Sequence, residues 1–178
     1  NSVTFIDAQR GWVVGSGGTI LSTADGGKSW QPQASGTTAW LYSVTFIDAQ
    51  RGWAVGGNGT ILSTADGGKS WQPQASGTDA WLYSVTFFDA QRGWAVGWGG
   101  TILSTADGGK SWQLQASGTD ARLHSVTFID AQRGWAVGRG GTILSTADGG
   151  KSWQPQAIDA RAWLDSVTYV DAQRGWAV

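Results

Sequence analysis

Carboxylates recur at fixed positions in a Gly-rich string, where they would be suited to act as acids or metal ligands. The string TADGGKSW occurs four times, and each copy holds one Asp and one Trp: Asp25 with Trp30, Asp66 with Trp71, Asp107 with Trp112, and Asp148 with Trp153. An Asp in a turn also accepts hydrogen bonds from nearby backbone N–H groups, and Gly adopts left-handed conformations without strain. We therefore expect these residues to lock a turn, and we predict no catalytic or metal-binding residues.

Arginine also recurs, in a pattern that suggests anion binding. Five Arg residues lie in identical DAQR strings: Arg10, Arg51, Arg92, Arg133 and Arg174. If these side chains gathered near the mouth of a central channel, they would form a ring of positive charge able to hold an anion or an acidic peptide. Each Arg also follows an Asp by three residues, as Arg10 follows Asp7, so local pairing is the simpler interpretation.

The composition indicates which elements must position these side chains. Of the 178 residues, 28 are Gly and 13 are Trp, all 13 acidic residues are Asp, and Met and Glu are absent. Glu and Met favour helices, whereas Gly disfavours them and is common in turns. We therefore predict an all-β fold, with 40% hydrophobic residues to form its core.

Several classes of protein are excluded by what the sequence lacks. Without Cys, and with His124 as the lone His, there is no disulfide framework and no Cys- or His-based zinc site, and we predict no cofactor. A net charge of −1 gives no general attraction to nucleic acid, and no apolar stretch approaches membrane-spanning length. Because the sequence opens at Asn1 without an initiator Met or a signal-type segment, we expect a processed, excised or engineered piece.

A 41-residue repeat decides the architecture. The string SVT followed by Phe or Tyr begins four full repeats and a partial one, over residues 2–42, 43–83, 84–124, 125–165 and 166–178. In the first copy, short strands are predicted over 2–6, 11–14, 19–23 and 29–34. Four short strands per repeat are typical of a β-propeller blade. We predict a single propeller domain over 1–178, with four-stranded antiparallel blades and a two-stranded half blade.

The same strings carry a resemblance to known families. TADGGKSW resembles the Asp-box of BNR proteins, and VTFIDAQRGWAVG followed by GTILSTADGGKSW resembles the YCF48-like repeat of photosystem II assembly factors. The resemblance implies a β-propeller, boxes that lie away from any active site, and a protein partner. Together with the absence of Cys, it is compatible with an extracytoplasmic or thylakoid-lumen-like compartment, although the residues give no address. The near-identical copies suggest recent amplification or consensus design.

The propeller order sorts the residues onto two faces. Turns between the first and second strands and between the third and fourth strands share one face, which carries the DAQR strings and the Asp-boxes. The other face carries the turns between the second and third strands and the crossings between blades, where nearly all variation lies. If one face binds a ligand, we expect it to be this second face, with candidate residues Ser16, Trp40, Trp81, Trp98, Arg122, His124, Arg139 and Trp163. Alternatively, exposed turns simply tolerate change.

The Trp residues divide in the same way. We expect nine of them in the core, at Trp12, Trp53, Trp94, Trp135 and Trp176 and at the four Asp-box positions. Trp40, Trp81 and Trp163 lie in crossings, where they would either cover the channel-side core or stand exposed for stacking on sugars or anchoring a protein partner. Trp98 replaces a small residue in a turn and is harder to explain as core.

Three hypotheses of function follow. We favour a non-enzymatic scaffold for protein interaction or self-assembly, because the half blade 166–178 leaves an apolar edge uncovered. The ring is then five-bladed with a half blade, is completed by oligomerisation, or belongs to a longer parent array. The alternative is a lectin-like propeller that binds a glycan. A sialidase-like glycosidase is the least expected, because near-identical blades lack the asymmetric residues that catalysis needs.

Overall fold

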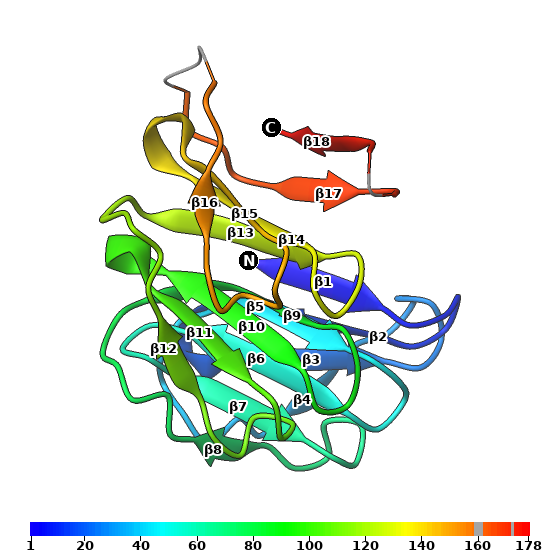
Figure 1. The fold of residues 1–178 in the computed structure, drawn as a ribbon. Coiled ribbons are helices and arrows are strands. Elements are labelled where there is room, and N and C mark those ends of the chain that lie inside the picture. Colours follow the sequence, from blue (N-terminus) through cyan, green and yellow to red (C-terminus); the bar gives the residue numbers. More distant parts are fainter. Residues whose placement is uncertain (159–161, 172) are drawn as a thin grey trace.

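The computed structural model describes residues 1–158, 162–171 and 173–178 and contains five antiparallel sheets arranged as successive blades (Figure 1). Four sheets have four strands and the last has two, as the repeat predicts. The strands of the first two blades are β1 (Ser2–Phe5), β2 (Gly11–Val14), β3 (Ile20–Thr23) and β4 (Gln31–Gln33), then β5 (Leu41–Phe46), β6 (Gly52–Gly56), β7 (Ile61–Thr64) and β8 (Gln72–Gln74).

The later blades repeat this pattern. Their strands are β9 (Leu82–Phe87), β10 (Gly93–Gly97), β11 (Ile102–Thr105) and β12 (Gln113–Gln115), then β13 (Leu123–Phe128), β14 (Gly134–Gly138), β15 (Ile143–Thr146) and β16 (Gln154–Pro155), and the half blade β17 (Val167–Tyr169) and β18 (Gly175–Ala177). Three turns between second and third strands contain a 3₁₀ segment: η1 (Ser16–Gly18), η2 (Trp98–Gly100) and η3 (Arg139–Gly141). No helix in the described part of the chain is long and apolar enough to span a membrane.

Three strands are shorter than predicted, for reasons of hydrogen bonding. The first strand ends at Phe5, because the Ile6 amide donates to the Arg10 carbonyl across the following turn. The fourth strand is shorter than residues 29–34, because the amide of Ser29 is bonded to the Asp25 carboxylate inside the preceding turn. The third strand begins at Ile20, because the amide of Thr19 closes the η1 turn on the Ser16 carbonyl. Side-chain and turn bonds therefore shorten the strands that the apolar pattern indicated.

The core lies between successive blades and is built from one repeated aromatic contact. Trp12 of β2 stacks on Phe46 of β5 with ring centroids 3.6 Å apart, and its indole N–H donates to the Gly67 carbonyl at 3.1 Å. The same stacking joins Trp53 to Phe87, Trp94 to Phe128, and Trp135 to Tyr169. Because the Trp of one blade needs the aromatic ring of the next, neighbouring blades are held in one relative arrangement.

The aromatic rings at the two ends of the row of blades are exposed, although the sequence predicts Trp176 in the core. Trp176 of β18 is 57% exposed, since no described blade follows the half blade to cover it. At the other side of the arc, Val3 and Phe5 of β1 are also exposed, although their equivalents Val44 and Phe46 are buried. Within the described residues, the half blade therefore does not cover the first blade and close the ring.

Candidate functional site

The Asp-boxes and DAQR turns form one face of the propeller, which we call the turn-lock face (residues 7–10, 24–29 and their equivalents in later repeats). The two kinds of turn are tied together by the amide of Gly26, which donates to the Gln9 carbonyl at 2.8 Å, and by equivalent bonds in later blades. This pairing places the first and third turns of each blade side by side, as the propeller order predicts.

The Asp-box carboxylates are fully engaged within their own turns. The Oδ1 atom of Asp66 accepts from the Ser70 amide at 2.9 Å and from the Thr64 hydroxyl at 2.8 Å, and Oδ2 accepts from the Ser70 hydroxyl at 2.6 Å. These bonds, those from Ser70 being strongest, lower the pKa of Asp66 to about 2. The arrangement recurs at Asp25, Asp107 and Asp148. Each carboxylate is thus committed to holding its turn.

The Arg residues of the DAQR turns are likewise paired locally. The Nε atom of Arg51 donates to Asp48 Oδ2 at 2.7 Å, while Oδ1 of the same carboxylate accepts from two backbone amides. The same ion pair forms at Arg10, Arg92, Arg133 and Arg174. Because each guanidinium is held by its own carboxylate, the five side chains do not present a ring of unpaired positive charge.

The opposite face, which we call the crossing face, brings together the variable residues. It consists of the crossings 37–42, 78–83, 119–124 and 162–165 and the turns 57–60, 98–101 and 139–142. At each of three blade junctions, a turn amide donates to a crossing carbonyl: Gly57 to Trp40 at 2.9 Å, Trp98 to Trp81 at 2.8 Å, and Arg139 to Arg122 at 2.9 Å. Three pairs of side-chain positions from adjacent repeats are thereby placed next to each other.

The crossing Trp residues stand exposed and do not cover the channel-side core. Trp40 is 58% exposed and Trp81 is 47% exposed, and Trp98 and Trp163 are similarly open. The next residue in each crossing is a buried Leu: Leu41 after Trp40, Leu82 after Trp81, and Leu164 after Trp163. Because successive side chains in an extended segment point to opposite sides, burying the Leu turns the Trp outward.

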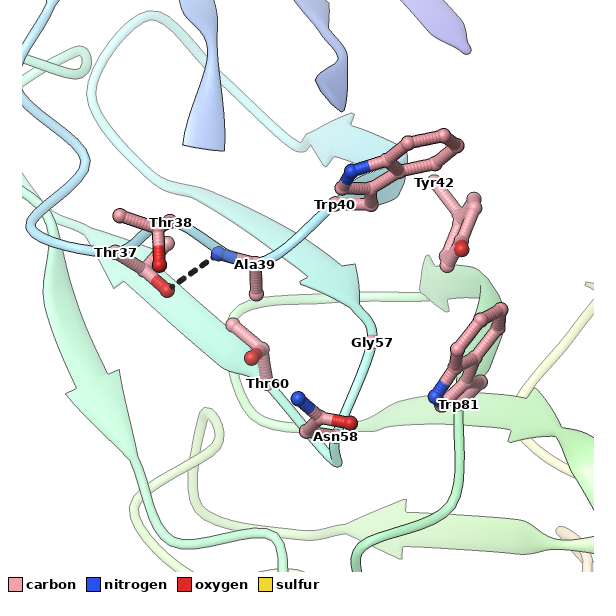
Figure 2. A pocket seen from close by; sticks show the side chains of 9 residues that line it. All are labelled: Thr37, Thr38, Ala39, Trp40, Tyr42, Gly57, Asn58, Thr60 and Trp81. Atoms are coloured by element: carbon pink, nitrogen blue, oxygen red, sulfur yellow. Dashed lines mark hydrogen bonds between the residues drawn. The ribbon is translucent and has the colours of Figure 1, made fainter. Parts of the chain in front are cut away.

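A pocket of about 430 Å³ opens at the first of these junctions (Figure 2). Trp40, Tyr42 and Trp81 form its aromatic side, and Asn58 and Thr60 lie opposite them. Gly57 lies between these groups and adds no side chain to the pocket. The pocket therefore combines apolar ring surface with a few hydroxyl and amide groups, as small ligand sites do.

A row of three ring side chains lies behind this face, of which the sequence indicated His124 but not the two Tyr residues. Tyr42, Tyr83 and His124 are each the extra residue where strand register shifts. Their rings approach one another, with centroids 5.2 Å apart for Tyr42 and Tyr83 and 5.7 Å apart for Tyr83 and His124. Burial raises the pKa of both Tyr residues. The signal available in the sequence was the 41-residue spacing from the candidate His124.

The last junctions carry cations stacked on aromatic rings. The Arg122 guanidinium carbon lies 4.1 Å from the centroid of the Trp98 ring, and that of Arg139 lies 5.1 Å from the Trp163 ring. His124 Nδ1 lies 2.8 Å from the Asp165 carboxylate. Ser16 lies in the turn of the first blade, which is bonded to the following crossing by the Gly18 amide on the Ala39 carbonyl and by the Leu41 amide on the Gly15 carbonyl. Residues 159–161 of the last crossing lie outside the described residues.

Comparisons with known proteins agree on the fold. The sequence matches the family described as photosynthesis system II assembly factor YCF48 over residues 31–113, 74–161 and 113–178. Among solved structures, "YCF48 bound to D1 peptide" is similar with 26% identity and a TM-score of 0.76, covering 99% of this chain and 58% of that one. YCF48 from Cyanidioschyzon merolae is similar with 22% identity and a TM-score of 0.74, covering 98% and 65%.

A glycoside hydrolase shares the architecture alone. An ancestral GH74 enzyme is 18% identical, with a TM-score of 0.75, over 93% of this chain and 25% of that one. No curated protein sequence matches the chain significantly. The chain spans less than two thirds of the length of either YCF48 structure.

Proposed function

The chain belongs to the photosynthesis system II assembly factor YCF48 family, and from this premise we propose that it is a non-enzymatic scaffold that binds an extended segment of a partner protein on its crossing face. The observation that carries the proposal is the row of exposed Trp side chains beside the pocket at Trp40 and Trp81. Exposed aromatic residues that flank a cavity are typical anchors for a protein partner. The YCF48 structure bound to a D1 peptide provides a precedent within the family.

The arrangement of polar groups favours binding over catalysis. The repeated carboxylates accept hydrogen bonds inside their own turns, and the repeated Arg residues are held by ion pairs. A catalytic site needs polar groups that converge on one point with perturbed proton affinity. The crossing face instead offers rings, hydroxyls and two stacked cations. Glycan binding uses similar exposed rings and is therefore an outcome that the experiment must distinguish.

The proposal is tested by titrating the chain with a labelled D1 peptide and, separately, with glucose, galactose and N-acetylglucosamine. We expect the peptide to bind and Trp81→Ala to weaken binding at least about tenfold, because truncating a central aromatic anchor costs about 2 kcal/mol. Phe88→Ala is the matched control, since this comparably exposed ring lies beside Arg92 on the turn-lock face, outside the crossing face.

The outcomes separate the alternatives. Peptide affinity that is unchanged in both Trp81→Ala and Trp98→Ala would remove the crossing face from the proposal. Binding of a simple sugar that disappears in Trp98→Ala, without peptide binding, would replace the protein-binding proposal with the lectin-like one.

Self-association is a second candidate function, favoured by the exposed rings at the two sides of the arc. Trp176 corresponds to Trp12, which stacks on Phe46, and Phe5 corresponds to Phe46. A second copy would reproduce the blade junction by placing its Phe5 against Trp176. We expect a native mass that is a multiple of 18.7 kDa and a shift to 18.7 kDa in Trp176→Ala. A monomer for the unaltered chain would exclude this candidate.

A further inference from the structure

One pair of positions on the crossing face recurs in all four full repeats: a residue of the turn between the second and third strands, and a residue of the crossing that follows in the same repeat. In the third repeat the pair is Trp98 and Arg122, and the guanidinium carbon lies 4.1 Å from the centroid of the indole ring. In the fourth repeat the pair is Arg139 and Trp163, with 5.1 Å between the same two groups. Both pairs join an indole to a cation, although the two residue types exchange places.

The first two repeats have an indole at this pair of positions but no cation. Their pairs are Ser16 with Trp40 and Gly57 with Trp81. A Cβ atom at Gly57 would lie 4.0 Å from the indole nitrogen of Trp81, so position 57 adjoins that ring as its equivalents do. Among the described residues, no cationic side chain lies over either indole. Two exposed rings therefore lack the cation that the later repeats supply from within the chain.

These two indoles line the same pocket, the one of about 430 Å³ (Figure 2). Tyr42 adds a third ring, whose centroid lies 6.0 Å from that of Trp81 and whose plane is inclined by 28° to it. Asn58 lies opposite the rings and has a left-handed φ of 55°, at a position where the third repeat has Gly99. Asn tolerates this conformation better than most residues do. The turn of the second repeat thus has no side chain at Gly57 and adds an amide to the pocket wall at Asn58.

The lining of the pocket favours a cation that needs no hydrogen bonds. Trp and Tyr rings attract cations to their faces, and clusters of such rings bind quaternary ammonium groups. The described residues that line the pocket include no carboxylate. A primary ammonium group would therefore lose hydrogen bonds to water without gaining a charged partner. A quaternary ammonium group has no hydrogen to donate and avoids this cost.

The charged side chains nearby are compatible with a bound cation. Asp79 lines an adjoining cavity of about 420 Å³ together with Trp81, and it makes no ion pair within the described residues. The Arg122 guanidinium lies over the rings of Trp98 and Tyr83 and does not line the pocket. A cation in the pocket therefore meets aromatic rings and not a like charge.

From this comparison of the repeats we infer that the pocket beside Trp40, Tyr42 and Trp81 binds a small organic cation that carries a quaternary ammonium group. The ligand brings to Trp81 the positive charge that Arg139 brings to Trp163. The inference goes beyond the proposed function, because it assigns a small-molecule ligand and does not require a partner protein.

Choline and a neutral analogue test this inference. The analogue is the alcohol in which a tert-butyl group replaces the trimethylammonium group, so the two compounds have the same shape and differ in charge. Each is titrated into the full chain by isothermal titration calorimetry. We expect choline to bind at least about fivefold more tightly than the analogue, which corresponds to one partly exposed cation–π contact. Equal affinity for the two compounds, or no measurable binding of choline, would overturn the inference.

A matched pair of variants places this preference in the pocket. Trp81→Leu keeps an apolar side chain but removes the ring, so the preference for choline over the neutral analogue should disappear. Phe88→Ala removes a ring of comparable exposure from the turn-lock face and should leave the preference unchanged. A preference that persists in Trp81→Leu would contradict the inference.

Two changes at position 57 test the comparison between repeats. Gly57→Arg introduces the cation that the fourth repeat has at Arg139, and it should abolish choline binding. Gly57→Ala adds only a Cβ atom in ordinary contact with its neighbours, and it should retain choline binding. Choline binding that survives Gly57→Arg would also overturn the inference.

The titration with the D1 peptide separates this inference from the proposed function. If the peptide binds and choline does not, the proposed function stands and the inference is overturned. If choline binds with the expected preference and the peptide does not bind, the inference stands and the proposed function falls.

Discussion

The two faces of the propeller use their polar and aromatic side chains in opposite ways. On the turn-lock face every repeat has the same residues, and their polar atoms bind one another, as the Asp66 carboxylate binds Ser70 and Thr64. On the crossing face the repeats differ, the indoles of Trp40, Trp81, Trp98 and Trp163 are exposed, and the guanidinium groups of Arg122 and Arg139 lie over aromatic rings. Repeated residues therefore stabilise the blade, and varied residues are available to a partner.

The largest effect that we expect is a loss of stability in acid, which arises on the turn-lock face. The four box carboxylates have a pKa of about 2, below the ordinary value of 3.8. Because the pKa is lower in the folded than in the unfolded state, their stabilisation is complete above about pH 4 and is lost as the pH falls through about 2. The urea midpoint of unfolding should fall steeply over this range.

Two variants sharpen the acid experiment. Replacing all four box Asp residues by Asn should lower the midpoint at pH 7 and flatten its dependence on pH. Trp98→Ala, on the crossing face, should leave the slope unchanged. A midpoint that stays constant from pH 5 to pH 2 in the unaltered chain would contradict the role assigned to the boxes.

The next largest effect is expected when one hydroxyl group is removed from each face, because the two losses of stability should differ. Thr64 is 5% exposed, and its oxygen accepts from the Gly68 amide at 2.9 Å. Thr64→Val leaves that buried amide without a partner and should reduce the free energy of unfolding by about 1–3 kcal/mol. Urea denaturation measures the loss, and peptide affinity should not change.

Thr60→Val is the matched control on the crossing face. The Thr60 hydroxyl lines the open pocket and makes no hydrogen bond within the described chain. Its replacement should change the free energy of unfolding by less than about 0.5 kcal/mol. If Thr64→Val and Thr60→Val lost the same free energy of unfolding, the two faces would not differ in the way proposed.

The smallest effect on stability is expected for Gly57→Trp, which gives the first junction the Trp that the second junction has at position 98. A Cβ atom at Gly57 would lie 3.9 Å from the Trp40 carbonyl and 4.0 Å from the Trp81 indole nitrogen, which is ordinary contact. Gly57→Trp should therefore change the free energy of unfolding by less than about 0.5 kcal/mol, while it fills the pocket and weakens binding of the D1 peptide.

Its neighbour provides the control for this change. A Cβ atom at Gly56 would come too close to the Trp40 carbonyl, so Gly56→Ala should lower the urea midpoint clearly. If Gly57→Trp destabilised the chain as much as Gly56→Ala, the side chain at position 57 would belong to the blade core and the crossing face would need to be redrawn.

The fold was accessible from the sequence because the 41-residue period and the short apolar strings determine it. The ends of the strands were harder to predict, because the Asp25 carboxylate and the η1 turn take up backbone amides that would otherwise bond to the neighbouring strand. Exposure of Trp176 could not be inferred from its string, because burial of the equivalent Trp12 depends on the next blade. The sequence named candidate residues one by one and could not pair them, because the junction pairs depend on hydrogen bonds between repeats and the placement of Tyr42 depends on a bulge.

The shared backbone bond at each junction has a consequence for how such a surface changes over generations. Since the amide of residue 57, 98 or 139 always meets the carbonyl of the preceding crossing, a junction keeps its frame whatever two side chains it holds. Each junction can therefore hold a different pair of side chains on the same backbone. Duplication or exchange of whole repeats changes the order of these pairs on the crossing face and leaves the packing of the blades unchanged.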